Sequence, residues 1–149
     1  MTFSIIEKKY KWAESLVPRT GKPKGIVEHH AAVARCTADD IHRWHLGNDW
    51  SGIGYHAFIT KTGKIYRGRP VGMRGAHCLN AGDWLGICYE GNFDHEKMNP
   101  KQLAAGKWLT SRWRGKFKIP KNKAKRHGDM PGNSTACPGR YFPLAKIVG

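Results

Sequence analysis

The segment 126–138 constrains the chain most, because it places two metal-ligand types on either side of a forced turn. His127 and Cys137 lie ten positions apart, and Pro131 and Gly132 between them predict a reversal of the chain. Imidazole nitrogen and thiolate sulfur are ligands that a borderline-soft ion such as Zn²⁺ prefers. A surface loop with a buried thiol would show the same pattern, so a further ligand is needed to decide.

The third candidate ligand lies in the segment 25–30, whose apolar residues predict a short buried strand that ends in two histidines. Neighbouring residues of a strand face opposite sides of a sheet, so His29 and His30 cannot easily both face one ion. The residues alone leave the choice between them open. A catalytic zinc site usually takes three protein ligands and keeps a fourth position for water, and one of these histidines would complete that set.

Strands and helices alternate along the rest of the chain, which predicts an α/β fold with one central mixed sheet flanked by helices. Strands are expected at 52–60 and 84–90, and 64–67 is expected to return from a turn as the second half of a hairpin. Segments 71–82 and 116–125 are expected to be an irregular loop and a basic connector. With 149 residues, the chain is expected to form a single domain, 1–149.

Three helices are expected. Thr37 is suited to cap the first, which ends at Gly47 and should turn Ile41, Trp44 and His45 inward. Pro100 suits the first position of the second helix, whose Leu103, Trp108, Leu109 and Trp113 can share a broad apolar face. A short terminal helix is expected over 141–147.

The chain is strongly basic, with 26 Lys and Arg against 11 Asp and Glu and a formal net charge of +15. That charge predicts attraction to a polyanion such as nucleic acid, anionic lipid or an acidic cell-wall polymer, and a surface that serves only solubility is the alternative. Nucleic-acid binding also predicts exposed aromatic residues among the basic ones. Segment 112–118 alone has that composition, and its Trp113 is already needed for the helix face, so nucleic acid is disfavoured.

Four cysteines, Cys36, Cys78, Cys88 and Cys137, include no close-set pair, which argues against a disulfide framework. No apolar run reaches the length of a membrane span, so no transmembrane segment is expected. The first residues lack the apolar core of a signal peptide. Synthesis in the cytoplasm without a signal peptide is therefore expected, and work outside the cell would need another exit route.

Four pieces of the sequence, in this order, resemble the zinc N-acetylmuramoyl-L-alanine amidases. That family is shared by amidase-type phage lysozymes, bacterial wall amidases and animal peptidoglycan recognition proteins. The pieces are residues 25–30, 54–59, 74–77 and 127–139. The resemblance covers about 26–140, so residues 1–24 are expected to be an extension packed on the catalytic domain.

The resemblance implies that His29, rather than His30, binds Zn²⁺ together with His127 and Cys137, in a surface cleft. It implies an enzyme that hydrolyses the amide bond between N-acetylmuramic acid and L-alanine in peptidoglycan, by a zinc-activated water. A phage or prophage endolysin or a bacterial wall autolysin, monomeric and acting on the cell wall after release, is expected. Non-catalytic peptidoglycan-binding relatives typically lose the thiolate ligand, whereas Cys137 is present here.

The same resemblance suggests roles for three more residues. Tyr55 matches a tyrosine beside the metal-bound water, and is expected to hydrogen-bond that water or the oxyanion, or to shuttle a proton. His77 matches a histidine that lines the substrate cleft, and a structural role is its alternative. Thr135 stands where many of these amidases carry an oxyanion-stabilising lysine, so it brings a hydroxyl but no charge. Of the remaining polar residues, His56 is expected to hydrogen-bond or pack within the fold. Glu90 is a weaker candidate base, and a solvated side chain at the end of a strand is its alternative.

Overall fold

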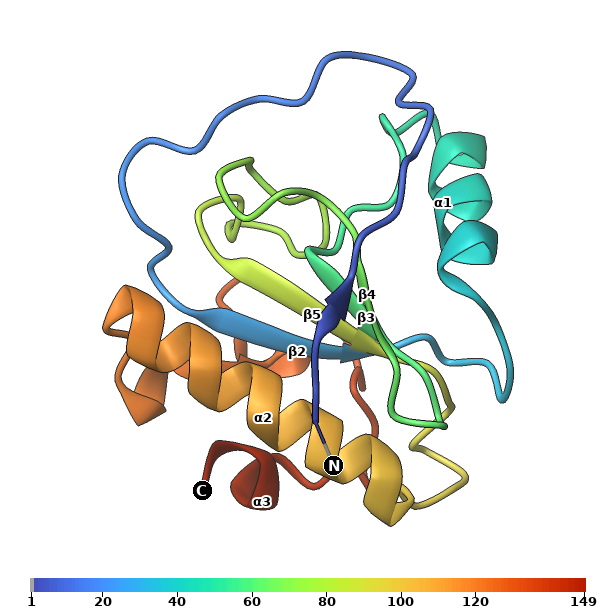
Figure 1. Ribbon diagram of the computed structural model, residues 1–149, viewed down its shortest axis with the longest axis vertical. Helices are drawn as coiled ribbons and strands as arrows, with labels where there is room; N and C mark the ends of the chain where they lie inside the picture. The colour runs from blue at the N-terminus through green and yellow to red at the C-terminus, as the bar shows by residue number, and fades with distance from the viewer. Residues whose placement is uncertain (1) are drawn as a thin grey trace.

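The computed structural model describes residues 2–149 and contains one six-stranded sheet in the order β1-β4-β3-β5-β2-β6 (Figure 1). The strands are β1 (Ile5–Ile6), β2 (Ile26–His30), β3 (Ala57–Ile59), β4 (Ile65–Arg67), β5 (Leu85–Tyr89) and β6 (Ala124–Arg126). Strands β3 and β4 pair antiparallel as the two halves of a hairpin, and the other neighbours pair parallel. The predicted α/β fold with a mixed sheet is confirmed.

The helices lie on both faces of the sheet (Figure 1). They are α1 (Ala38–Gly47), α2 (Pro100–Phe117) and α3 (Leu144–Val148), with 3₁₀ turns η1 (Lys121–Lys123) and η2 (His127–Asp129). Helix α2 packs Leu109 and Trp113 against one face of the sheet, whereas α1 packs Ile41 against Phe58 and Cys88 on the other. No helix within residues 2–149 has the length and hydropathy needed to cross a membrane.

Local capping sets where the two longer helices begin. The Thr37 side chain accepts a hydrogen bond from the Asp40 backbone N–H, and the Asp40 carboxylate accepts one from the Thr37 N–H. Asn99 caps α2 by accepting from the Gln102 N–H, and Pro100 occupies the first turn. Both predicted helix starts are confirmed.

Strand β2 alternates its side chains between the two faces of the sheet, and this alternation positions the site. Glu28 faces α2, where its carboxyl accepts hydrogen bonds from the Tyr89 hydroxyl at 2.8 Å and the Thr110 hydroxyl at 2.9 Å. Burial raises the pKa of Glu28 to about 7, and these two donors satisfy it inside the core. The next residue, His29, therefore faces the opposite side of the sheet.

The structure corrects two of the expected elements, adds two strands and corrects the orientation of one side chain. The strand expected at 52–60 is reduced to β3, because the Ile53 and Gly54 N–H groups donate to the rings of His42 and His45 on α1 instead of to a neighbouring strand. Strands β1 and β6 form in the N-terminal extension and at the end of the basic connector, where no strand was expected. The terminal helix begins only at Leu144, after Pro143. Trp44 on α1 is 42% exposed instead of facing inward.

Candidate metal centre

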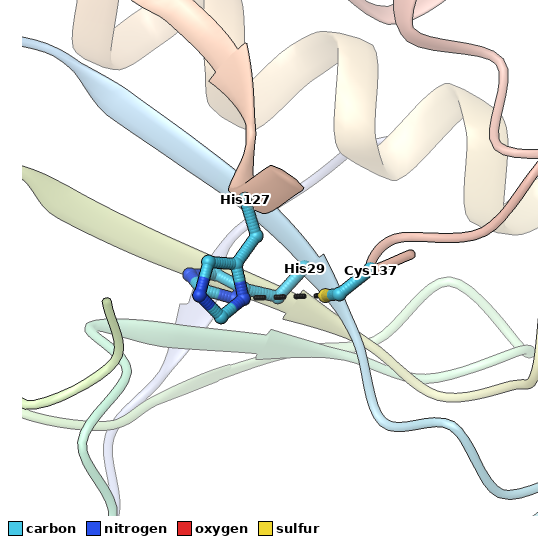
Figure 2. Close-up of side chains that lie close together, drawn as sticks. All are labelled: His29, His127 and Cys137. Atoms are coloured by element: carbon cyan, nitrogen blue, oxygen red, sulfur yellow. Dashed lines mark hydrogen bonds between the residues drawn. The ribbon is translucent and has the colours of Figure 1, made fainter. Parts of the chain in front are cut away.

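Three side chains that could hold a metal ion converge on one side of the sheet (Figure 2). His29 comes from β2, His127 opens the turn η2 directly after β6, and Cys137 lies in the loop that follows. One ligand atom from each residue lies within 4.8 Å of the other two. The side chain of His30 is turned away, and its Nδ1 accepts a hydrogen bond from the Phe93 N–H at 3.0 Å. The geometry therefore brings His29, and not His30, to the other two residues.

The spacing and chemistry of this group fit a zinc ion. Tetrahedral zinc, with bonds of about 2.0 Å to nitrogen and about 2.3 Å to sulfur, separates these two atoms by roughly 3.6 Å. His29 Nδ1 lies 3.8 Å from Cys137 Sγ. The His30 backbone N–H points at the same sulfur at 3.4 Å, a contact that favours a thiolate. Burial raises the pKa of Cys137 to about 12, so a cation is needed to displace the thiol proton at neutral pH.

His77 is hydrogen-bonded to Nε2 of His29, the ring nitrogen that faces away from Cys137. His29 Nε2 lies 2.9 Å from His77 Nδ1, and His77 Nε2 lies 2.9 Å from the Trp84 carbonyl oxygen. A carbonyl only accepts, so His77 carries its proton on Nε2, and burial lowers the pKa of His77 to about 4, which keeps the ring neutral. His77 Nδ1 must then accept from His29 Nε2–H. The lone pair of His29 Nδ1 is thereby left free to face Cys137.

A glycine in β5 makes room for His77. A Cβ atom at Gly86 would come within 2.6 to 2.8 Å of three atoms of the His77 ring, so only glycine lets the imidazole lie directly on the strand. The Gly86 N–H donates to Nδ1 of His56, whose Nε2 donates to the Met73 carbonyl oxygen at 2.8 Å. The expectation that His56 hydrogen-bonds within the fold is confirmed.

His127 is held by Asn133, a residue that the sequence analysis did not identify. His127 Nε2 lies 3.0 Å from Asn133 Oδ1, which also accepts from the Leu79 N–H at 3.2 Å. The Asn133 amide nitrogen donates to the Leu79 carbonyl, which confirms Oδ1 as the acceptor and His127 Nε2 as the donor. One signal could have revealed it, since metal-bound imidazoles usually donate their second N–H to an oxygen, and Asn133 carries the only side-chain amide between the two ligands.

A groove of about 340 Å³ opens beside His127. Its lining consists of Trp50, Ala76, His77, Cys78, Leu79 and His127. Trp50 and Leu79 are exposed at its edge. One member of the candidate metal group, His127, thus lines a surface cleft.

Residues 19–140 match the family model described as N-acetylmuramoyl-L-alanine amidase. The chain belongs to this amidase family. Zinc dependence is general in the family, and the group of His29, His127 and Cys137 is one that could bind the metal. The resemblance deduced from the four sequence pieces is confirmed.

Solved and curated relatives agree with the family assignment. The structure of the N-acetylmuramoyl-L-alanine amidase LysC from Clostridium intestinale is 38% identical, with a TM-score of 0.91 over 98% of this chain and 95% of that chain. Peptidoglycan-recognition protein SD of Drosophila melanogaster is 37% identical over 60% of this chain and 53% of its own length. The endolysin of Enterobacteria phage K11 is 26% identical over 80% of this chain and 82% of its own length. The chain thus spans about half the length of the first of these curated relatives.

Two other expected residues of this amidase-family chain lie close to the group. The Tyr55 ring lies 4.9 Å from the His29 ring, centroid to centroid. Burial, with a smaller effect from the Cys88 and Cys137 thiols, raises the pKa of Tyr55 well above its usual value, so its hydroxyl keeps a proton to donate. Thr135 is exposed, and its hydroxyl accepts a hydrogen bond from the Cys137 N–H at 3.2 Å.

Glu90 has a different role from that of a base in this amidase fold. Its two carboxylate oxygens accept hydrogen bonds from the backbone N–H groups of Lys61, at 2.8 Å, and Cys36, at 3.3 Å. The side chain therefore ties together two loops that follow β2 and β3. Each of its carboxylate oxygens already accepts from one backbone donor.

Proposed function

We propose that the protein hydrolyses the amide bond between N-acetylmuramic acid and L-alanine in peptidoglycan, with Zn²⁺ bound by His29, His127 and Cys137. The convergence of these three residues beside an open groove, in a chain of the amidase family, carries the proposal. The names of two similar proteins, the amidase LysC and the phage K11 endolysin, support a wall-degrading activity. Retention of the cysteine favours hydrolysis over binding alone.

In this proposal the zinc-bound water and the Tyr55 hydroxyl would lie beside the substrate amide. A zinc ion would lower the pKa of a water molecule to about 7 and polarise the substrate carbonyl. The two imidazoles and the thiolate leave a fourth position open. Tyr55 keeps its proton at neutral pH and donates a hydrogen bond to the oxyanion that develops on the carbonyl, or passes that proton onward.

Thr135 and His77 have smaller parts in the proposed reaction. The Thr135 oxygen already accepts from the Cys137 N–H, so its O–H remains available to donate to the substrate carbonyl. His77 forms part of the groove wall beside the substrate. Because both of its ring nitrogens are hydrogen-bonded within the protein, its contact with substrate is made through ring carbons.

We also propose that anionic wall polymers attract the protein. Between Glu96 and Asp129 the chain contains eleven Lys and Arg and no acidic residue. None of these basic side chains forms an ion pair with another residue in the range 2–149. The exposed members are Lys97, just before α2, and seven residues on α2 and the turn after it: Lys101, Lys107, Arg112, Lys116, Lys118, Lys121 and Lys123.

The wider setting follows from the same proposal. The protein would act as a monomeric endolysin or autolysin on the cell wall, with residues 1–149 as one catalytic domain. The segment before residue 25 would be an extension packed on that domain. Its strand β1 pairs with β4, and its Glu7 and Lys8 form ion pairs with Arg67 and Asp39 at 3.0 and 3.1 Å, which supports this part of the proposal.

Digestion of purified cell wall tests the proposed reaction. Cleavage of the muramoyl–alanine bond exposes one new α-amino group, on alanine, and no new reducing sugar end. Chelation should abolish amine release, and added Zn²⁺ should restore it. Release of reducing ends without amines would identify a glycosidase, and wall binding without any release would identify a binding module. Either result would refute the proposed amidase activity.

A further inference from the structure

One loop lies behind both histidines of the candidate metal centre. We call residues 77–84 the clamp loop. It begins with His77, which accepts from His29, and ends with Trp84, whose carbonyl accepts from His77. Between them, the backbone of Leu79 holds Asn133 through both its N–H and its carbonyl group. The two histidines are 98 positions apart in the chain, yet both rings are held by groups attached to this one loop.

We propose that the clamp loop is the positioning element of the metal centre. Through His77 and Asn133 it fixes the Nε2–H tautomer of both His29 and His127, so that each ring presents Nδ1 to the ion. This inference rests on the proposed ligand set of His29, His127 and Cys137. His77 and Asn133 are positioning residues in it, because each acts on the metal through another side chain.

On the His29 side of the clamp loop, His29 donates to His77, and His77 donates to the backbone carbonyl of Trp84. The Trp84 carbonyl oxygen cannot donate, and this fixes the proton of His77 on Nε2 and that of His29 on Nε2. His29 is 1% exposed, so no water competes for its ring nitrogens. The His77 ring is itself seated on Gly86, which leaves it little freedom to turn.

The His127 ring depends more on the clamp loop for its orientation, because this ring is only half buried. Asn133 Oδ1 accepts from both His127 Nε2–H and the Leu79 N–H, and its amide nitrogen donates to the Leu79 and Pro131 carbonyl groups. These bonds prevent the amide from flipping to present its nitrogen to His127. Asn80 on the clamp loop adds a separate bond to the Pro131 carbonyl at 3.3 Å, which joins the two loops without touching an imidazole.

An acceptor behind a ligand histidine acts on metal affinity in two ways. It holds the ring in the orientation that binding requires, and it increases the electron density on the nitrogen that faces the metal. Removal of such a partner typically lowers metal affinity by roughly 10- to 100-fold. Loss of the clamp should therefore weaken zinc binding in a protein that still folds.

Zinc competition against a chromophoric chelator, without substrate, tests this inference. His77→Phe and Asn133→Leu each remove an acceptor while keeping a side chain of similar size. Each should weaken zinc binding by about 10- to 100-fold. Asn80→Ala is the matched control, because it removes a bond between the same two loops and no acceptor, and it should bind zinc within about threefold of the unchanged protein.

Folding is followed separately, by cooperative urea unfolding of the zinc-free proteins. If an apolar variant does not fold, His77→Asn or Asn133→Asp replaces it, since each keeps an oxygen near the lost acceptor and should bind zinc within about threefold of the original protein. A greater than tenfold loss in these acceptor-retaining variants, while folded, would contradict the inference. So would undiminished zinc affinity in folded His77→Phe and Asn133→Leu. A loss confined to one of these two would overturn the claim that one loop serves both histidines.

The outcomes remain separable from those of the proposed function. If the zinc affinities of the protein and its variants follow the prediction but no amine is released from cell wall, the proposed hydrolysis is refuted and the inference on the clamp loop stands. A protein that hydrolyses wall but loses no affinity in the variants would refute the clamp alone. Absence of zinc binding in the unchanged protein would refute both.

Discussion

At the residue scale, the Tyr55 hydroxyl is the main protonated donor that we assign to the reaction. Tyr55→Phe removes this hydroxyl and keeps the ring that packs beside His29. Turnover should fall about 10²-fold, the typical effect of removing one oxyanion or acid–base contact, while zinc content stays at the original level. Steady-state amine release and metal analysis on the same preparation measure both. Unchanged turnover would remove Tyr55 from the mechanism.

His56 makes the fold sensitive to acid. Burial lowers the pKa of His56 to about 3, and its Nδ1 must stay unprotonated to accept from the Gly86 N–H. An unfolded histidine gains its proton near pH 6.5, so the unfolded state binds more protons below that pH and the free energy of unfolding falls as pH drops toward 3. Between pH 6.5 and 4.5 this single residue should cost about 2–3 kcal/mol.

His56→Asn separates this effect from the other histidines, because its Oδ1 replaces Nδ1 as the acceptor but does not titrate. The variant should be less stable at pH 7, since it loses the bond to the Met73 carbonyl. Its free energy of unfolding should nevertheless fall by about 2–3 kcal/mol less between pH 6.5 and 4.5. Urea unfolding in the presence of a chelator measures both proteins. Parallel pH profiles would contradict the assignment.

The residues that bind the metal in our proposal could be selected from sequence, but their supports could not. Cys137 and His127 stood out because imidazole and thiolate are ligands that zinc prefers and a turn separates them, and the family resemblance then favoured His29. The sequence placed His77 in the cleft without showing that it bonds to a histidine 48 positions away. Asn133 carried only a weak signal, the one side-chain amide between the two ligands, and the contact that holds it comes from Leu79, which is 54 positions distant.

At the element scale, two glycines of α2 predict opposite effects of the same substitution. A Cβ at Gly106 would come within 2.6 Å of the Tyr89 hydroxyl, which cannot move freely because it donates to Glu28. At Gly115 a Cβ would meet nothing within 4 Å. Gly106→Ala should cost about 1–3 kcal/mol through overpacking, whereas Gly115→Ala should gain about 0.5–1 kcal/mol through helix propensity.

Urea unfolding of the two alanine variants at one pH measures this difference. Each variant controls for the other, since both add one methyl group to the same helix. Equal shifts in the two proteins would contradict the close approach of α2 to β5. A gain in stability at Gly106 would have the same meaning.

Elements whose ends are set by local hydrogen bonds could be predicted from the sequence, whereas elements that depend on distant partners could not. The starts of α1 and α2 were predictable because Thr37 and Asn99 cap them through local bonds. Strands β1 and β6 were missed, since they contain only two and three residues and depend on pairing with β4 and β2. The expected strand at 52–60 was too long because the α1 histidines capture its first N–H groups, a contact between elements that no local pattern reveals.

At the scale of the whole molecule, the net charge of +15 predicts a salt-dependent attachment to the wall. Electrostatic attraction is screened within about 8 Å at physiological ionic strength and about 3 Å at 1 M salt. Binding to intact walls should therefore weaken steeply as salt rises. Hydrolysis of a small uncharged muramoyl-peptide should barely change, because it does not depend on the long-range field.

A variant with Lys107, Lys116 and Lys121 changed to Gln is the control for the basic surface of α2 and the turn after it. These side chains are exposed, and none belongs to the metal group or lines the groove beside it, so the variant should keep its activity on the small substrate. Its wall binding should respond less to salt. Wall binding that is insensitive to salt in the unchanged protein would mean that the excess charge serves solubility or another partner.

The zinc content and amine release of cysteine variants test the central claim most directly. The unchanged protein should hold one zinc per chain, Cys137→Ala should lose both the metal and the hydrolysis of wall amides, and His29→Ala should be far more damaging than His30→Ala. Cys78→Ala is the matched control, because this thiol lines the groove but lies outside the metal group, and it should keep both properties. Stoichiometric zinc and undiminished hydrolysis in Cys137→Ala would contradict the account.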